Sequence, residues 1–136
     1  MPRVSVLLPV RDAAPTLGPC LDSLRGQTLA DHEVIAVDDG STDGTGALLD
    51  ARAAADPRLR VRHTPPRGLA PALNLALESA RAPILARMDA DDVAFPERLA
   101  RQAERLEGDP STDVLGCRVE LLVAPARRGC GLTSNG

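Results

Sequence analysis

The sequence predicts an α/β protein with three layers, in which helices cover both faces of a mainly parallel sheet. Short apolar runs rich in β-branched residues alternate along the chain with segments of helical periodicity. The first run, Val4–Val10, is almost entirely apolar instead of alternating, which is typical of a strand buried on both faces. With 136 residues the chain is long enough to form one such domain with its own core.

The remaining strands follow the same reasoning, because each is a short apolar run bounded by turn-forming or charged residues. The second strand runs straight into a turn-forming cluster, residues 39–44, and the fourth runs into an acidic segment. A last apolar run extends from Val114 to Val123 and predicts a fifth strand. After Val4–Val10, the expected strands cover residues 33–38, 59–63, 84–88 and 114–123.

Four helices are expected between and after these strands, each from apolar residues that recur every three or four positions. Pro96 suits the first turn of the last helix, and Gly108 and Pro110 stop it. The predicted core-facing residues are Leu17, Leu21 and Leu24; an alanine-rich run over residues 45–55; Leu69, Leu73, Leu77 and Ala80; and Leu99, Ala103 and Leu106. We expect residues 1–123 to form the domain and residues 124–136 an irregular tail.

Composition excludes several partners. The net charge is −3 and no basic stripe stands out, so we expect no nucleic-acid partner. No apolar run approaches the roughly 20 residues that span a bilayer, and no leader is recognised, so we expect a cytoplasmic protein, in solution or at the inner face of the membrane. The cysteines at positions 20, 117 and 130 fit neither a disulfide framework nor a zinc pattern, and we expect reduced thiols, with Cys130 exposed.

Acidic side chains follow three of the predicted strands. Asp12 follows the first strand, Asp38 and Asp39 end the second, and the segment Asp89-Ala90-Asp91-Asp92 follows the fourth. Ligands of open α/β sheets bind beyond the carboxyl ends of the strands, which lie at one edge. Carboxylates so close together repel one another unless a cation lies among them, and their hard oxygens suit Mg²⁺ or Mn²⁺.

Acids in this pattern can have other uses. Helix capping stays open for Asp38 and Asp39, and Ser41 or Asp43 is expected to cap a helix. An aspartyl phosphotransferase or a receiver domain needs a lysine, which the chain lacks. A calcium loop needs an oxygen ligand where Val93 stands, and a dinucleotide-binding fold needs a glycine-rich turn after the first strand. A metal that bridges a diphosphate fits the pattern.

Four segments together carry a specific resemblance. They are VSVLLPVRDA from residue 4, VIAVDDGSTDGT from residue 34, GLAPALNLAL from residue 68 and ILARMDADDVAFPERLARQ from residue 84. In this order and spacing, residues 2–122 resemble the N-terminal, nucleotide-sugar-binding part of family 2 glycosyltransferases. The resemblance implies the Rossmann-like GT-A fold, truncated at the C-terminus because family members usually continue for another hundred residues or more.

The resemblance also implies roles for particular residues. The donor, a UDP-sugar first among the candidates, would lie against Pro9, Val10 and Arg11, with Asp39 accepting a hydrogen bond from the pyrimidine and Asp38 supporting the loop. Asp91 would approach the ribose or the sugar, Asp92 would bind Mg²⁺ or Mn²⁺ directly with Asp91 beside it, and Asp89 would lend charge. Arg67 and Asn74 stand where the family contacts the base or the diphosphate. The residues implied for donor binding are Pro9, Val10, Arg11, Asp38, Asp39, Arg67, Asn74, Asp89 and Asp91, and those implied for the metal are Asp91 and Asp92.

The function that follows is inverting transfer of a sugar from a nucleoside diphosphate to a hydroxyl of a glycan, a lipid or another acceptor. The family's catalytic base lies in the half that follows, and Glu120 is not placed like that base, so we expect no base in this chain. The alternative is a truncated or inactive nucleotide-binding fragment.

We also expect exposed sheet surface to favour homo-oligomers, Arg87 to pair with nearby acids, and His63 to be structural.

Overall fold

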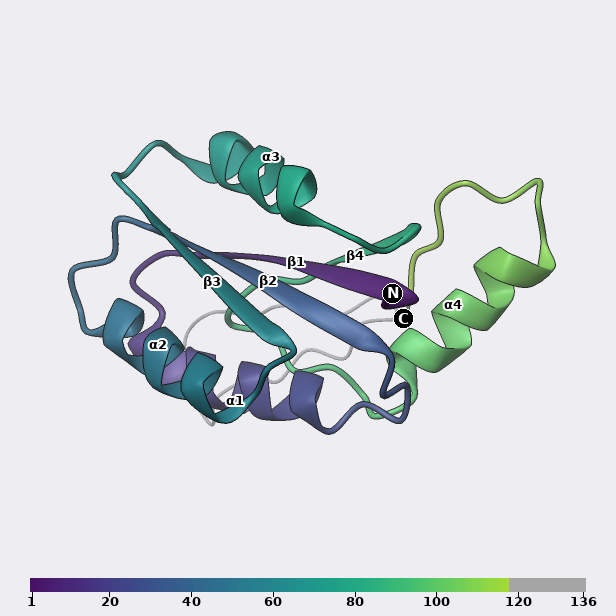
Figure 1. Cartoon of the computed structure of the whole chain (residues 1–136), viewed down its shortest axis with the longest axis horizontal. Coiled ribbons are helices and arrows are strands. Elements are labelled where there is room, and N and C mark those ends of the chain that lie inside the picture. The colour runs from purple at the N-terminus through teal and green to yellow at the C-terminus, as the bar shows by residue number, and fades with distance from the viewer. Residues whose placement is uncertain (118–136) are drawn as a thin grey trace, which may run out of the picture.

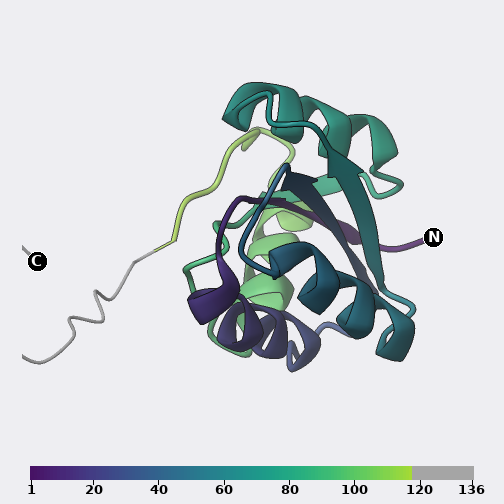
Figure 2. The same cartoon turned by 90° about the vertical axis from the view of Figure 1, so that its left-hand side faces the viewer.

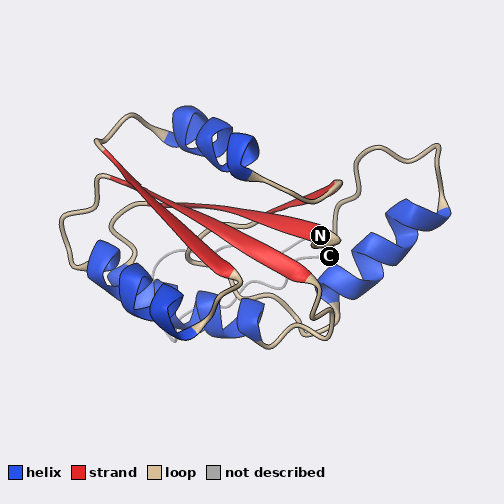
Figure 3. Cartoon of the chain, viewed as in Figure 1, coloured by secondary structure: helices blue, strands red, loops and turns tan. Residues whose placement is uncertain are grey.

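The computed structural model describes residues 1–117 and contains a four-stranded sheet and four helices (Figures 1 and 3). Strands and helices alternate strictly along the chain, as the sequence predicts. In chain order the elements are β1 (Val4–Val10), α1 (Ala14–Arg25), β2 (His32–Asp39), α2 (Thr45–Ala55), β3 (Leu59–Thr64), α3 (Leu69–Ser79), β4 (Ile84–Arg87) and α4 (Arg98–Gly108).

All neighbouring strands are parallel, in the order β3-β2-β1-β4. Helix α3 covers one face of the sheet, and α1 and α2 lie on the other (Figures 1 and 2). Helix α4 packs on the same side as α1 and α2, because Leu99 and Ala103 join their core cluster. The predicted three-layer α/β fold with a parallel sheet is therefore confirmed.

Strand β1 supplies side chains to both cores, which explains why it is almost wholly apolar. Val6, Leu8 and Val10 pack with the helices α1, α2 and α4, whereas Leu7 faces α3 in a second cluster. Successive side chains of a strand point to opposite faces, so a central strand covered on both faces needs apolar residues at every position.

A polar network around Glu33 holds the amino-terminal side of the sheet together, and no local pattern predicted it. The carboxylate of Glu33 accepts hydrogen bonds from the Ser5 hydroxyl (2.7 Å), the Arg81 N–H (2.9 Å) and the Arg60 guanidinium (3.0 Å). Burial would raise the pKa of Glu33, but these hydrogen bonds outweigh it and lower that pKa. The network ties β1, β2, β3 and the turn before β4 together.

The packing of α3 differs from the prediction. Its buried residues are Ala72 and Ala76, while Leu69 and Leu77 are 52% and 48% exposed. The predicted stripe is therefore wrong at these two leucines, although Leu73 and Ala80 do pack against the core. Alanines face the sheet because a small side chain lets a helix approach closely, and the leucine spacing alone could not reveal that.

Among residues 1–117, strand β4 forms the edge of the sheet next to β1 and is partly exposed. Leu85 is 44% exposed, and the side chain of Arg87 is exposed as well, so Arg87 does not bear the cost of burial that the sequence suggested. Residues 114–117 form no strand, while residues 118–123 of the predicted fifth strand and the predicted tail lie outside the described residues. The homo-oligomer stays a prediction. No helix within residues 1–117 is long and apolar enough to cross a membrane.

Candidate functional site

The loops that follow β1 and β2 interlock at the carboxyl edge of the sheet. The Asp12 carboxylate accepts a hydrogen bond from the Thr42 N–H (2.7 Å), and the Asp12 N–H donates to the Ser41 hydroxyl (2.9 Å). Asp12 adopts a φ of 46°, a left-handed conformation that its short side chain tolerates by bonding locally. The two loops are therefore held as one unit.

The Asp43 carboxylate adds further hydrogen bonds to the same unit. It accepts a hydrogen bond from the N–H of Ala14, in the first turn of α1 (3.1 Å), and another from the N–H of Thr45, in the first turn of α2 (3.1 Å). Asp43 is not the N-cap residue of either helix, since those are Ala13 and Gly44, but this one side chain accepts a first-turn N–H of both helices.

Asp39 connects this unit to the loop after β3. Its side chain is buried, and its two oxygens accept hydrogen bonds from the N–H groups of Arg67 (2.8 Å) and Gly68 (3.0 Å), immediately before α3. The guanidinium of Arg11 lies 4.0 Å away. Each carboxylate oxygen has a second lone pair, so Asp39 retains acceptor capacity for a ligand while it anchors the loop.

Asp38 points toward β3 and α2. Its carboxylate accepts a hydrogen bond from the Ser41 N–H (3.1 Å) and lies 2.9 Å from the Nδ1 of His63. Burial would raise the pKa of Asp38, but the hydrogen bonds from Ser41 and His63 prevail and lower it. The geometry gives Asp38 a loop-supporting position.

The other residues implied for donor binding differ in accessibility. Pro9 and Val10 are buried in β1, where they pair with Val37 and Asp38, and Val10 packs in the core. Arg67 and Asn74 are exposed, on the loop before α3 and on α3 itself. The structure thus brings Arg11, Asp39 and Arg67 together, and it keeps the side chain of Val10 away from the surface.

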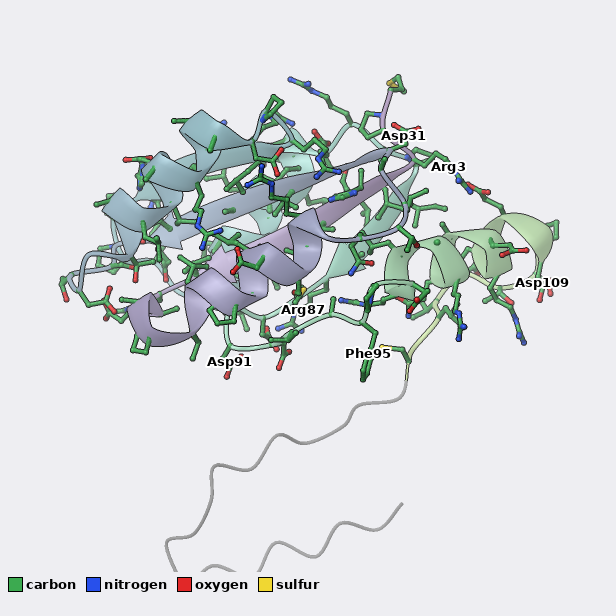
Figure 4. All side chains as sticks on the ribbon, turned by 90° about the horizontal axis from the view of Figure 1, so that it is seen from below. Arg3, Asp31, Arg87, Asp91, Phe95 and Asp109 are labelled. Carbon is green, nitrogen blue, oxygen red and sulfur yellow. The ribbon has the colours of Figure 1, made fainter. Side chains whose placement is uncertain are left out.

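The acidic segment lies at the end of β4, next to α1. Its backbone is fixed by the Met88 N–H, which donates to the Leu7 carbonyl (3.1 Å), and by the Ala94 N–H, which donates to the Ser23 hydroxyl (3.0 Å). Ala90 and Ala94 are buried in the core. This anchoring leaves the acids exposed, and Figure 4 shows Asp91 projecting outward beside Arg87, with Phe95 projecting further along.

Asp89, Asp91 and Asp92 form a compact cluster of carboxylates. One oxygen from each lies within 4.8 Å of the others. Burial raises the pKa of Asp92, and the charges of Asp91 and Asp89 raise it further. Mutual repulsion of this kind is what a cation relieves, and three carboxylates match the hard oxygen ligands of Mg²⁺ and Mn²⁺. The three carboxylates are therefore suitable ligands for the expected Mg²⁺ or Mn²⁺.

Positive and neutral groups border the cluster. The Arg87 guanidinium lies 3.6 Å from the Asp89 carboxylate, so the predicted pairing of Arg87 with an acid is confirmed. The Cys20 thiol lies beneath the segment, 3.6 Å from the Asp89 carbonyl. Burial, reinforced by the charges of the three aspartates, raises the pKa of Cys20 to about 12. Cys117, by contrast, is exposed.

This geometry can be compared with known proteins. The model of "Glycosyl transferase family 2" matches residues 5–126. The chain belongs to glycosyl transferase family 2. Among curated relatives of this family 2 chain, the "Uncharacterized glycosyltransferase EpsJ" of Bacillus subtilis is 36% identical over 120 residues, which are 86% of this chain and 34% of EpsJ. The "Putative glycosyltransferase EpsH" of the same organism is 36% identical over 116 residues, 85% of this chain and 33% of EpsH. The chain thus spans about a third of the length of these relatives.

Solved structures agree with the GT-A fold. The mannosyltransferase PcManGT from Pyrobaculum calidifontis, in complex with GDP-Man and Mn²⁺, is 37% identical with a TM-score of 0.73, covering 81% of this chain and 33% of that one. TarS 1–349 of S. aureus, in complex with UDP, is 27% identical with a TM-score of 0.72, covering 79% of this chain and 32% of that one.

Two features of this candidate site were not predicted from the sequence. His63 contacts two acids at once, and the carboxylate of Asp39 is engaged by backbone N–H groups. The contacts of His63 had one available signal, because His63 ends one predicted strand and Asp38 ends another. Nothing in the sequence indicated the second, because it depends on how the loop before α3 folds back.

Proposed function

We propose that this domain binds the nucleoside-diphosphate sugar of an inverting glycosyltransferase through a divalent cation. The observation that carries the proposal is the cluster of Asp89, Asp91 and Asp92 at the same sheet edge as Asp39. Family membership supports it, and so do structural neighbours whose complexes contain UDP, UDP-GlcNAc, or GDP-Man with Mn²⁺.

In this proposal each carboxylate has a distinct task. Asp91 and Asp92 hold Mg²⁺ or Mn²⁺, with Asp89 adding charge while it is paired with Arg87. The bound cation supplies positive charge that stabilises the leaving nucleoside diphosphate. Asp91 also orients ribose or sugar hydroxyls by accepting their hydrogen bonds, and we propose that the exposed Asn74 and Arg67 contact the base or the diphosphate.

Base recognition is assigned to the interlocked loops. Asp39 uses its free lone pairs to accept an N–H of the base, and Arg11 stacks its planar guanidinium on the ring. The buried Pro9 and Val10 contribute the rigid end of β1 beneath these residues. Because the carboxylate of Asp39 is already fixed by two backbone N–H groups, it binds a ligand without a further ordering cost.

Transfer also requires a base that removes the proton of the acceptor hydroxyl, which we propose to belong to a glycan or a lipid. We assign no residue within 1–117 to that role. This chain spans about a third of the length of its relatives EpsJ and EpsH. We propose that complete transfer also requires residues that correspond to the rest of their length.

The test is calorimetry of the chain with UDP and with GDP, in Mn²⁺ and in EDTA. We expect binding that requires Mn²⁺ and weakens at least tenfold in Asp92→Asn, a loss of about 1.4 kcal/mol. Asp31→Asn is the matched control, because this exposed aspartate lies at the opposite end of the sheet from Asp91, beside Arg3 (Figure 4). Absence of binding in all conditions, or binding indifferent to both Mn²⁺ and Asp92→Asn, contradicts the proposal.

A further inference from the structure

His63 joins two acids that come from different elements. Its Nδ1 lies 2.9 Å from the Asp38 carboxylate at the end of β2, and its Nε2 lies 2.8 Å from the Asp50 carboxylate on α2. Asp38 is buried, whereas the side chains of His63 and Asp50 are exposed to solvent. The imidazole therefore connects the end of β2 to α2, the helix that follows the loop of residues 40–44.

The local backbone is built to admit this contact. Gly46, in the first turn of α2, lies against both partners. A Cβ added at Gly46 would come within 2.9 Å of the Asp38 Oδ2 and 3.5 Å of the His63 Cε1. A side chain at position 46 would therefore displace the Asp38 carboxylate, whereas its Cβ would make only an ordinary van der Waals contact with His63.

A continuous set of hydrogen bonds leads from His63 to the proposed donor loops. The Asp38 carboxylate, held by His63, accepts the Ser41 N–H (3.1 Å). The hydroxyl of Ser41 accepts the Asp12 N–H (2.9 Å), and Asp12 in turn holds Thr42 (2.7 Å). Asp39, the residue proposed to bind the base, follows Asp38 directly in the chain, and the Asp38 carboxylate holds the loop that begins there through the Ser41 N–H.

We propose that His63 is a positioning residue for donor binding, which acts through Asp38 to hold residues 39–42 in their binding conformation. The inference rests on the proposed function, since it concerns the affinity of the same nucleotide site. His63 touches no substrate in this role. Asp50 secures the other side of the ring and contributes less to the loop, because it lies on the helix side of the imidazole.

The protonation of His63 provides a second readout. The charged groups that face the ring are Asp38 from β2 and Asp50 from α2, while Gly46 adds no charge. Hydrogen bonds to Asp38 and then Asp50 raise the pKa of His63 above its ordinary 6.5. The imidazolium donates to both acids, whereas the neutral ring has a single N–H and can donate to only one of them. Loop positioning should therefore weaken as the pH rises through this raised pKa.

Two isosteric variants separate the two hydrogen bonds. The side-chain amide of His63→Asn places a donor near the Nδ1 position, toward Asp38, and that of His63→Gln places one near the Nε2 position, toward Asp50. In calorimetry with UDP and Mn²⁺, we expect His63→Gln to weaken binding about tenfold and His63→Asn less than about threefold; tenfold corresponds to about 1.4 kcal/mol. We also expect the advantage of the wild type over His63→Asn to shrink between pH 6 and pH 9.

The outcomes are decisive in both directions. Equal affinity of His63→Gln and wild type, or equal losses in both variants, overturns the inference. Thermal unfolding checks that each variant is folded; if His63→Gln is not, the pH dependence of the wild type relative to His63→Asn decides, and a constant ratio overturns the inference.

A readout without nucleotide separates this inference from the proposed function. If the wild type binds neither UDP nor GDP, the proposed function fails, yet amide hydrogen exchange at Ser41 still reports on Asp38. Faster exchange in His63→Gln than in His63→Asn supports the positioning role, and equal rates overturn it.

Discussion

The carboxylate of Asp39 is predicted to stabilise the fold as well as the proposed base contact, and Asp39→Asn tests this. Asp39 is 5% exposed, and its oxygens accept the N–H groups of Arg67 at 2.8 Å and Gly68 at 3.0 Å. An asparagine keeps one acceptor but turns an NH₂ group toward the other N–H. The variant therefore loses one hydrogen bond to a charged group and leaves one buried donor unpaired.

A hydrogen bond to a charged group contributes about 1.5 to 3 kcal/mol, so we expect Asp39→Asn to lower the free energy of unfolding by about 2 kcal/mol. With a urea dependence of about 1.5 kcal/mol per molar, the unfolding midpoint falls by roughly 1.3 M. Urea unfolding followed by circular dichroism measures this shift. Asp31→Asn makes the same chemical change at an exposed position and should stay within about 0.5 kcal/mol of wild type. An Asp39→Asn midpoint equal to that of the control would refute the reasoning.

Three further predictions follow from the described residues. Gly40 has a φ of 70°, and an added Cβ would lie 2.7 Å from the backbone nitrogen of Pro66, whereas Gly44 has a φ of 87° with nothing within 4 Å. Gly44→Ala should therefore cost only the strain of about 1 to 2 kcal/mol, and Gly40→Ala about 1 to 3 kcal/mol more; equal urea midpoints would contradict the clash. Burial alone would raise the pKa of Glu33, but hydrogen bonds from Ser5, Arg81 and Arg60 lower it. The stability that ionised Glu33 contributes is therefore fully present above the ordinary pKa of 4.5 and is lost as the pH falls through the lowered pKa. Glu33→Gln should be about 2 kcal/mol less stable than wild type at pH 7, with a gap that narrows below pH 4.5; a gap independent of pH would show that the charge is not the cause. Burial raises the pKa of Cys20 to about 12, so iodoacetamide at pH 8 should modify the exposed Cys117 and leave Cys20 unmodified until urea is added, as read by peptide mass spectrometry; early labelling of Cys20 would show that the thiol is accessible.

The order of elements and the central strands followed directly from the sequence. A strand covered on both faces must be apolar at nearly every position, and β1 shows this without alternation. The acids after β1, β2 and β4 could be placed on one edge before any coordinates, because parallel strands end at the same edge. Four sequence motifs in the expected order also indicated the family to which the chain belongs.

Other features required the tertiary structure. The leucine spacing of α3 predicted the wrong buried residues at Leu69 and Leu77, because the close approach of the helix to the sheet selected Ala72 and Ala76 instead. The exposure of Arg87 depended on β4 being an edge strand, which a local pattern does not encode. The contacts of Asp39 and His63 join residues from separate loops, strands and helices.

The sequence by itself therefore determined the first four strands, the acids that end three of them and the family to which the chain belongs. Periodicity and short motifs are local properties, so they can be recognised in the sequence alone. Only the tertiary structure decided how those acids are used: Asp43 accepts first-turn N–H groups of two helices, Asp38 and Asp39 anchor loops, and Asp89, Asp91 and Asp92 cluster at the surface. Hydrogen bonding and burial depend on neighbours brought together by folding, so residues of the same chemical type acquired different roles.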